Sequence, residues 1–331
     1  MTTLRSLVRR AVFATALTTA AGACGGEGNA RVTVPSGASM RLAADSLEAA
    51  GVIGSARAFS LYAKLTGHDR SIKAGTYLFD RRTSWNTIIS SLVAGRGLVF
   101  TVTIPEGWDL KTIVPSISDV MKVPAESLDA AAHDTALIHR LDIPVPTLEG
   151  YLFPETYLLP DGSPALTIVR RLVNEFERRW KPEWNARLGQ LGLTRHQVIT
   201  LASIVEKEAR VPAERPIISA VYHNRLKRGM LLQADPTIQY ALGRHTARVL
   251  YKDLEVKSPY NTYRNVGLPP GPIASPGTAS IEAALFPADV PYLYFVAHPD
   301  GHHEFRATLR EHNEAVRQMR ALRRQATSAR P

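Results

Sequence analysis

The sequence has a single cysteine, Cys24, among 331 residues. One cysteine excludes an internal disulfide and any zinc site built from cysteine ligands. The chain also lacks the G-x-S-x-G nucleophile motif, the H-E-x-x-H zinc motif, a P-loop and internal repeats. These absences argue against serine hydrolases, zinc hydrolases and P-loop nucleotide-binding enzymes.

A hydrophobic run long enough to cross a membrane is missing as well. Arginines within Met1–Arg10 precede Ala11–Ala23, an uncharged and largely apolar run of 13 residues, whereas a spanning helix needs about 20. A basic segment followed by a short apolar one is typical of an export signal. Residues 1–24 are therefore predicted to be a signal or membrane-anchor segment and residues 25–30 a linker, with the rest of the chain outside the cytoplasm.

The cysteine lies at the end of this apolar run, directly after Ala21-Gly22-Ala23. That arrangement resembles a bacterial lipoprotein processing site, which makes Cys24 a candidate for lipidation. An uncleaved helical anchor and a cleaved signal with full secretion are the alternatives. With either anchor, the protein is expected at the bacterial inner membrane, with its ectodomain on the periplasmic or extracytoplasmic side.

Positive charge predominates, with a net charge of +10 and a sequence pI near 9.8. Such a charge favours anionic surroundings such as phospholipid headgroups, anionic wall polymers or nucleic acid. The basic residues are scattered and no nucleic-acid-binding motif accompanies them, so nucleic acid is not an expected partner. The arginine-rich end, Arg317–Arg330, is predicted to be a solvated helix end, with residues 321–331 as a disordered tail.

Hydrophobic periodicity and capping residues predict an α+β fold with two modules. The first module, residues 31–97, has the order strand, helix, helix, strand, helix, with Ser39, Ser55 and Ser84 as helix caps. It contains no cluster of His, Cys or acidic residues with catalytic spacing, and we interpret it as a binding or positioning module. The second module, residues 98–320, is mixed, helix-rich and predicted to be catalytic.

Within the second module, Leu98–Ile104 is predicted to be a strand and Ser163–Leu191 mostly one long amphipathic helix. Leu148–Pro160 is rich in proline and aromatic residues and too broken for one regular element. Ser258–Gly277 is predicted to be a long loop of hydroxyl, amide and aromatic side chains, which is typical of a surface that binds a polar, ring-shaped ligand. A strand over Tyr292–Ala297 precedes the last helix.

Two glutamates lie in the helix that is predicted to follow Thr194. Thr194 and Gln197 form a capping box, and on a helical wheel the polar residues gather on one side: His196, Thr200, Ser203, Lys207 and Arg210. Glu206 and Glu208 fall in the apolar arc opposite, roughly 160° apart around the axis, so they do not share one proton. Burial among apolar side chains raises the pKa of a carboxyl group and favours the protonated form that a general acid requires.

Metal chemistry is not supported by the pattern of histidines. His298, His302, His303 and His312 have no standard metal-ligand spacing. The first three lie in HPDGHH, which is more simply a polar turn. Neither a metal nor another cofactor is therefore expected.

With serine, metal and nucleotide chemistry not supported, the remaining candidate is catalysis by a carboxyl group on a sugar. A two-carboxylate glycosidase needs a partner for the acid, and Glu208, Glu214 and Asp235 are candidates, although spacing places none of them opposite Glu206. A one-carboxylate mechanism needs no water-activating partner when a substrate hydroxyl is the nucleophile.

Six sequence blocks, in the same order, resemble one known family. They are IPEGW at Ile104–Trp108, LEGYLFPETY at Leu148–Tyr157, ASIVEKEA at Ala202–Ala209, HNRL at His223–Leu226, LQADPT at Leu232–Thr237, and YNTY with GLPPGPI within Tyr260–Ile273. Together they resemble the endolytic murein transglycosylase family, the YceG-like proteins, over roughly residues 31 to 313. The resemblance implies a LysM-like subdomain for residues 31–97 and a YceG-like catalytic domain for residues 98–320.

In that family a single Glu of the I-V-E-K-E block is the catalytic acid/base, and the resemblance assigns this role to Glu206. It implies that Glu206 protonates the glycosidic oxygen between N-acetylmuramic acid (MurNAc) and N-acetylglucosamine (GlcNAc). The same carboxylate then takes the proton of the muramoyl C6 hydroxyl, which attacks its own C1. The product is a 1,6-anhydroMurNAc end, and such cleavage of nascent strands is expected to limit glycan elongation.

Polar residues of the neighbouring blocks are candidates for substrate binding: Glu208, Gln233, Asp235, Thr237, Tyr260, Asn261 and Thr262. Each of them can instead brace the loop against the helix. The expected partners are peptidoglycan glycan strands, the cell membrane through the N-terminal segment and, from the family, peptidoglycan polymerases. The alternatives are a non-catalytic peptidoglycan-binding envelope protein and a water-using muramidase that leaves reducing ends.

Overall fold

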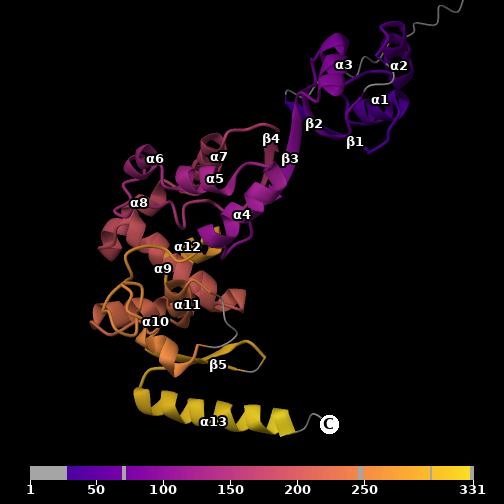
Figure 1. Cartoon of the computed structure of the whole chain (residues 1–331). Helices are drawn as coiled ribbons and strands as arrows, with labels where there is room; N and C mark the ends of the chain where they lie inside the picture. Colours follow the sequence, from indigo (N-terminus) through magenta and orange to yellow (C-terminus); the bar gives the residue numbers. More distant parts are fainter. Residues whose placement is uncertain (1–27, 69–71, 245–248, 299, 329–331) are drawn as a thin grey trace, which may run out of the picture. The chain divides into compact units, whose positions relative to one another are not determined.

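The computed structural model describes residues 28–68, 72–244, 249–298 and 300–328, and its fold is α+β, as predicted (Figure 1). Its contacts divide the chain between Gly97 and Leu98 into two units, each of which is described by itself. The predicted signal or anchor segment and Cys24 lie outside the described residues. Within the described ranges, no helix is both long and apolar enough to cross a membrane.

The first unit is built on an antiparallel pair of strands, β1 (Asn29–Val34) and β2 (Gly75–Asp80). Between these strands in the chain come α1 (Met40–Ala49) and α2 (Ala56–Leu65), which contact each other, and α3 (Trp85–Ala94) follows β2. The order of elements is therefore the predicted one.

The three helices of this unit begin where the sequence predicts. The hydroxyls of Ser39, Ser55 and Ser84 each accept a backbone N–H from the first helical turn. Such caps stabilise a helix by about 1 kcal/mol, because they satisfy an N–H that has no partner within the helix. Gly95 ends α3 in the left-handed conformation, with φ of 76°.

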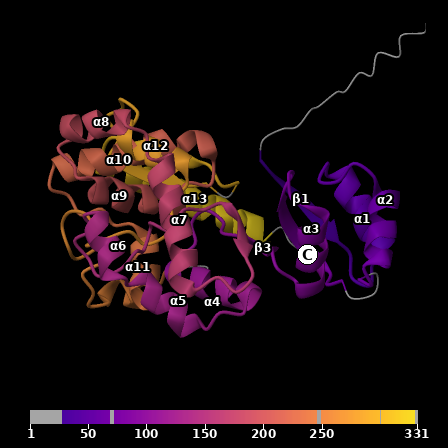
Figure 2. The same cartoon turned by 90° about the horizontal axis from the view of Figure 1, so that it is seen from above.

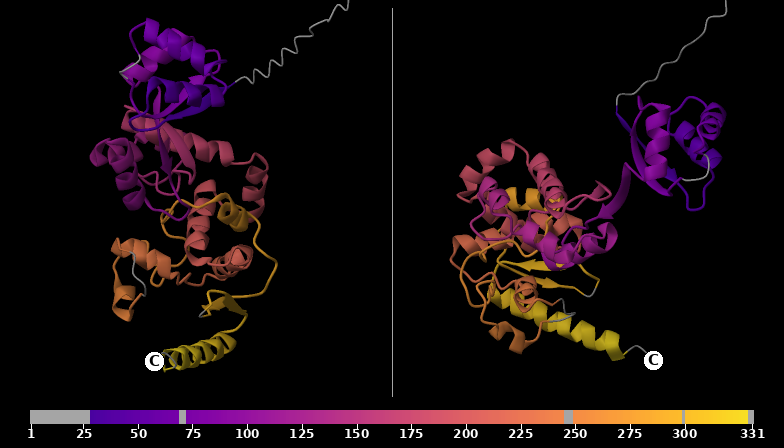
Figure 3. Two further views of the ribbon diagram at one scale, coloured as in Figure 1. Left: turned by 90° about the vertical axis from the view of Figure 1, so that its right-hand side faces the viewer. Right: turned by 45° about the horizontal axis from the view of Figure 1, so that its top comes forward.

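The second unit contains most of the helices. Its elements are β3 (Leu98–Thr103), α4 (Leu110–Met121), α5 (Ala125–Ala132), α6 (Thr135–Arg140), β4 (Thr156–Pro160), α7 (Ala165–Arg179), α8 (Glu183–Leu191), α9 (Arg195–Glu208), η1 (Pro212–Glu214), α10 (Arg215–Lys227), α11 (Asp235–Leu242), η2 (Tyr251–Glu255), α12 (Thr278–Leu285), β5 (Tyr294–Ala297), β6 (His303–Arg306) and α13 (Leu309–Ser328). Antiparallel pairing joins β3 to β4 and β5 to β6. Helix α5 packs against α4 and α7 (Figure 2), and α13 packs along the β5–β6 hairpin (Figure 3).

Two segments of this unit differ from the prediction, and a third agrees with it. The predicted long helix over Ser163–Leu191 is two helices, α7 and α8, because Pro182 lacks the N–H that a continuous helix requires at that position. As predicted, Leu148–Pro160 is not one regular element, and only its last five residues form a strand, β4. Helix α13 continues to Ser328, so the tail predicted to be disordered from residue 321 is helical over most of its length.

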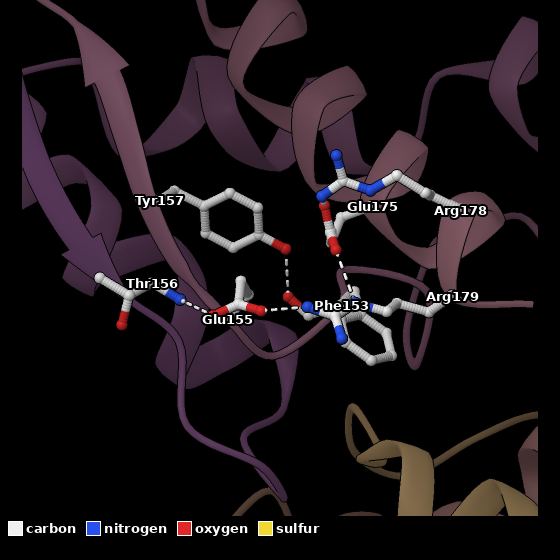
Figure 4. A network of polar contacts seen from close by, with 7 residues as sticks. All are labelled: Phe153, Glu155, Thr156, Tyr157, Glu175, Arg178 and Arg179. Carbon is white, nitrogen blue, oxygen red and sulfur yellow. Dashed lines mark hydrogen bonds and ion pairs between the residues drawn. The ribbon is translucent and has the colours of Figure 1, made fainter. Parts of the chain in front are cut away.

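A network of charged side chains fastens the start of β4 to α7 (Figure 4). Arg179 bridges two carboxylates, Glu175 on its own helix and Glu155 beside β4, and Arg178 also pairs with Glu175. Glu175 is buried and the two arginines neutralise its charge. The hydroxyl of Tyr157 donates to the Phe153 carbonyl at 2.5 Å, which closes the turn before the strand.

Helix α9 lies at the centre of the second unit, in contact with α8, α10, α11 and α12 (Figure 1). The capping box predicted for Thr194 and Gln197 is present. The side on which the polar residues gather is itself buried, since His196, Thr200 and Ser203 are at most 7% exposed. A helix that is buried along most of its length is a rigid support for the side chains of its C-terminal turn.

The loop over residues 258–277 covers this polar side of α9. His196 Nε2 donates to the Pro270 carbonyl at 2.8 Å, and Ser203 Oγ accepts the Ile273 N–H at 3.0 Å. The polar residues of α9 therefore hold the loop in place.

Candidate active site

The last turn of α9 carries the two glutamates in different surroundings. Glu206 is 7% exposed in its side chain; its Oε1 lies 3.3 Å from Nη2 of Arg215, and its Oε2 accepts the Gly277 N–H at 3.1 Å. Both carboxyl oxygens of Glu206 thus have partners from other elements. Glu208, two residues on, contacts neither partner.

A second carboxyl group, Glu106 of the IPEGW block, lies beside the ion pair of Glu206. Its Oε2 is 3.9 Å from Nη2 of Arg215. Burial, followed by the charge of Glu206, raises the pKa of Glu106. Gly277 fits here because a Cβ at this position would overlap the Glu106 carboxyl group. The group of Glu106, Glu206 and Arg215 therefore joins the IPEGW turn, α9, α10 and the start of α12.

Glu208 lines a pocket of about 420 Å³. The hydroxyl of Tyr222 on α10 donates a hydrogen bond of 3.1 Å to Glu208 Oε1. Burial, followed by the charge of Asp235, raises the pKa of Glu208 to about 7, although the Tyr222 hydrogen bond and nearby arginines lower it. Near neutral pH this carboxyl group is therefore poised between its protonated and ionised forms.

Side chains from several elements form the walls of this pocket, which we call the Glu208 pocket. They are Glu208, Tyr222, Arg225, Leu232, Gln233, Asp235, Tyr263, Phe295, Val296, Ala297, His303 and His312. The Tyr263 hydroxyl donates to Asp235 Oδ1 at 2.5 Å, and Arg225 is fixed by the Leu232 and Leu293 carbonyls, each at 2.7 Å. The pocket therefore combines a carboxylic acid, polar groups and aromatic rings, the composition expected of a site for a sugar.

Of the predicted substrate-binding residues, three line this pocket: Glu208, Gln233 and Asp235. Gln233 has a left-handed backbone with φ of 50°, which its N–H bond of 3.0 Å to the Thr262 carbonyl helps to hold. A non-glycine residue in this conformation carries backbone strain, and such strain is common at binding sites.

Three other candidates brace the loop. Thr237, Asn261 and Thr262 are at most 1% exposed. The two threonine hydroxyls lie 2.8 Å apart, and the Asn261 amide donates to the Leu254 and Val256 carbonyls at 2.9 and 2.8 Å. With their polar groups bonded internally, these residues support the segment that carries Gln233 and Asp235.

Tyr260 lies away from the Glu208 pocket, with its ring 4.8 Å from that of Tyr240. Tyr240 donates at 3.4 Å to Glu149 of the LEGY block. Both Glu149 oxygens also accept the Leu110 N–H at the start of α4, at 3.3 and 3.1 Å, and burial raises the pKa of Glu149 to about 8. Glu149 is thus a buried acid that links the LEGYLFPETY block to the start of α4 and, through Tyr240, to Tyr260.

The four histidines considered as metal ligands do not form one cluster. His298 and His302 lie with Asp300 in the β5–β6 turn, where three potential ligand atoms are within 4.8 Å of one another. His303 instead faces Glu214, and His312 on α13 stacks on Tyr294. The expectation that no metal is needed stays a prediction.

Sequence reasoning missed part of the pocket. Arg225 belongs to the HNRL block and Tyr222 directly precedes it. A helical wheel of α10 could have placed these two residues on the same side of the helix. His303 and His312 gave no such signal, because β6 and α13 bring them to Glu208 only through the folding of a distant segment.

Comparisons with known proteins agree with the fold. The model of the YceG-like family matches residues 32–318. A relative from Bacillus subtilis (strain 168), named endolytic murein transglycosylase, is 38% identical over 299 residues, which cover 86% of this chain and 83% of the relative. A relative of the same name from Streptococcus pneumoniae serotype 2 (strain D39 / NCTC 7466) is 31% identical over 297 residues, covering 80% of this chain and 54% of the relative.

The crystal structure of a YceG-like protein from Listeria monocytogenes has a similar fold. Its TM-score is 0.61 at 34% identity, and the match covers 87% of this chain and 99% of that one. The chain therefore belongs to the YceG-like family.

Proposed function

We propose that this protein is a lytic transglycosylase that cleaves peptidoglycan. Membership of the YceG-like family supports the proposal, as do relatives named endolytic murein transglycosylase at 38% and 31% identity. The reaction proposed is cleavage of the MurNAc–GlcNAc bond of nascent strands to leave 1,6-anhydroMurNAc ends. A helix-borne carboxylic acid in a polar pocket supplies the group that this reaction needs.

The acid of this reaction is best assigned to Glu208. The observation that carries the assignment is the Glu208 pocket itself, where a carboxyl group with a pKa raised to about 7 meets the polar side chains of Gln233 and Asp235. A general acid is most effective when its pKa lies near the working pH. Glu206, which the sequence resemblance designates, is the competing candidate, but both of its oxygens are engaged by Arg215 and Gly277.

In the proposed reaction, protonated Glu208 gives its proton to the glycosidic oxygen as the bond to the muramoyl C1 breaks. The transition state resembles an oxocarbenium ion. The muramoyl C6 oxygen attacks C1, loses its proton and closes the anhydro ring. Water is not consumed, so the products together have the mass of the substrate.

The other roles of the chain are also proposals. The strand, helix, helix, strand order of β1, α1, α2 and β2 supports a LysM-like first unit that binds glycan. The N-terminal segment, through an apolar helix or lipid on Cys24, would hold the enzyme at the membrane. There it would act beside peptidoglycan polymerases and limit strand elongation.

The test is digestion of uncross-linked glycan strands by the full chain and by the variants Glu208→Gln and Glu206→Gln, with products identified by mass spectrometry. Glu126→Gln, an exposed glutamate on α5, is the matched control. We expect anhydro ends from the unmodified protein and the control, and a loss of at least about 100-fold in rate for Glu208→Gln.

Other outcomes separate the alternatives. If Glu206→Gln loses much more of the cleavage rate and Glu208→Gln stays active, the general acid is Glu206. Products heavier by one water would indicate a muramidase. Strand binding without any cleavage by the unmodified protein would leave a non-catalytic peptidoglycan-binding protein.

A further inference from the structure

The turn between β5 and β6 brings together three side chains that can bind a metal ion. His298 directly follows β5, His302 directly precedes β6, and Asp300 lies between them in the chain. One potential ligand atom of each residue lies within 4.8 Å of the other two. Asp300 Oδ1 is 3.2 Å from Nδ1 of His298 and 2.5 Å from Nδ1 of His302. None of the three lines the Glu208 pocket.

Hydrogen bonds within the turn hold these residues in place. The His298 N–H donates to the His302 carbonyl at 2.7 Å, and the Gly301 N–H donates to the His298 carbonyl at 3.0 Å. Asp300 Oδ1 also accepts the His302 N–H at 3.2 Å. Gly301 has a φ of 99°, a conformation that favours glycine. The turn itself therefore brings the three side chains together, although their spacing in the sequence matches no common metal motif.

One nitrogen of this group lacks a hydrogen-bond partner in the described part of the chain. Nδ1 of His298 is a buried atom without a hydrogen bond, since the Asp300 oxygen 3.2 Å away is not oriented for one. A buried polar atom without a partner is unfavourable and rare in folded proteins. The rings of His298 and His302 are stacked, with centroids 4.4 Å apart and 18° between their planes. A cation bound by both rings and the carboxylate gives this nitrogen a partner.

The donor atoms determine which kind of ion fits. Imidazole nitrogens bind Zn²⁺ and other transition-metal ions, whereas Mg²⁺ and Ca²⁺ prefer sites made of oxygen atoms. The ligands of a tetrahedral Zn²⁺, about 2.0–2.1 Å from the ion, are roughly 3.4 Å apart, so small side-chain rotations bring the three atoms into position. The side chains of His298, His302 and Asp300 are 26%, 44% and 62% exposed, which leaves space for water as a fourth ligand.

We propose that His298, Asp300 and His302 bind one divalent transition-metal ion, such as Zn²⁺, in the β5–β6 turn. The ion joins the end of one strand to the start of the next, and its role is structural. The hairpin supplies Phe295 and His303 to the wall of the Glu208 pocket, so the ion stabilises that wall and takes no part in catalysis. The inference does not depend on the proposed function.

The test is calorimetric titration of Zn²⁺ into the full chain after treatment with EDTA and removal of the chelator. We expect one ion to bind per chain. His298→Ala and His302→Ala are expected to weaken binding at least about 10- to 100-fold, since even the loss of a residue behind a metal ligand has an effect of this size. His133→Ala is the matched control, because His133 is also a half-exposed histidine near an aspartate, Asp129, and is expected to leave binding unchanged.

A second measurement follows the stability of the protein. An ion that binds only the folded turn raises the midpoint of thermal unfolding in proportion to its occupancy. Zn²⁺ is therefore expected to raise the midpoint of the unmodified protein and of His133→Ala, and to leave that of His302→Ala unchanged.

Two results would overturn the inference. One is the absence of saturable Zn²⁺ binding by the unmodified protein. The other is equal binding by the unmodified protein and the two alanine variants. The visible spectrum of Co²⁺ bound to the unmodified protein needs no variant, and a spectrum identical to that of Co²⁺ in water would also contradict the site. Glycan cleavage is measured separately, and its presence or absence leaves the conclusion on metal binding unaffected.

Discussion

The hydroxyl of Tyr222 donates its hydrogen to Glu208 Oε1 at 3.1 Å. Burial and the charge of Glu208 raise the pKa of Tyr222 well above its usual value, so the hydroxyl stays a donor. A donor stabilises the ionised carboxylate and lowers its pKa, whereas desolvation acts in the other direction and is larger. The balance of these effects keeps the pKa of Glu208 near 7.

The first prediction concerns the activity at alkaline pH. If Glu208 is the acid, only its protonated form reacts, so kcat/KM falls tenfold per pH unit above about pH 7. Tyr222→Phe removes the hydrogen bond that favours the ionised form of Glu208. The pKa of Glu208 therefore rises, and the fall in kcat/KM begins at higher pH. The measurement is a pH profile of kcat/KM for both proteins, and a fall that begins at the same pH in both would contradict the assignment.

The second prediction concerns the stability of the buried acid Glu149, whose pKa is about 8 when folded against an ordinary 4.5. Because the folded pKa is raised, the native state is most stable below pH 4.5 with respect to this group and loses that stability as the pH rises through 8. The loss is on the order of a few kcal/mol. In Glu149→Gln this part of the pH dependence disappears, so the stability of the variant relative to the unmodified protein rises between about pH 4.5 and pH 8 in urea unfolding. Parallel curves for the two proteins would show that Glu149 is not a buried neutral acid.

The third prediction concerns Gly150 of the LEGY block. Its φ is +81°, and a Cβ there would overlap the Pro272 ring. Gly162 has a similar φ of +71° with nothing within 4 Å of its Cβ position. We expect Gly162→Ala to lower the free energy of unfolding by about 1 kcal/mol through backbone strain alone, and Gly150→Ala by about 3 kcal/mol or more through strain and overlap. Equal losses in urea unfolding would mean that the contact with Pro272 is unimportant.

The fourth prediction is that no metal takes part in the reaction. Glycan cleavage is expected to continue at the same rate in excess EDTA, because the proposed proton transfers use side chains alone. Added Zn²⁺ that binds the His298, Asp300 and His302 group is likewise expected to leave kcat unchanged. Loss of activity in EDTA that Zn²⁺ restores would contradict this mechanism.

The local features of the fold could be predicted from the sequence. Ser39, Ser55, Ser84 and Thr194 act within one helical turn of themselves, so their capping roles do not depend on the rest of the chain. The break between α7 and α8 was missed because apolar periodicity runs on either side of Pro182, although proline itself was a signal.

The site depended on contacts that no local pattern contains. A helical wheel separated Glu206 from Glu208 correctly but had no means to decide which one meets a pocket. That difference comes from Arg215 and Gly277 on one side of α9 and from Tyr222 and Asp235 on the other. For the same reason the wheel could not show that the loop over residues 258–277 covers the polar side of α9.

The Glu208 pocket also has a consequence for the order in which the protein matures. Glu208 is synthesised well before β5, β6 and α13, which supply Phe295, His303 and His312 to the pocket. A nascent chain that already contains α9 has the acid without this wall, and a protease that removed the hairpin would return it to that condition. The pocket around Glu208 is therefore complete only when the C-terminal segment has been synthesised and has folded against α9 and α10.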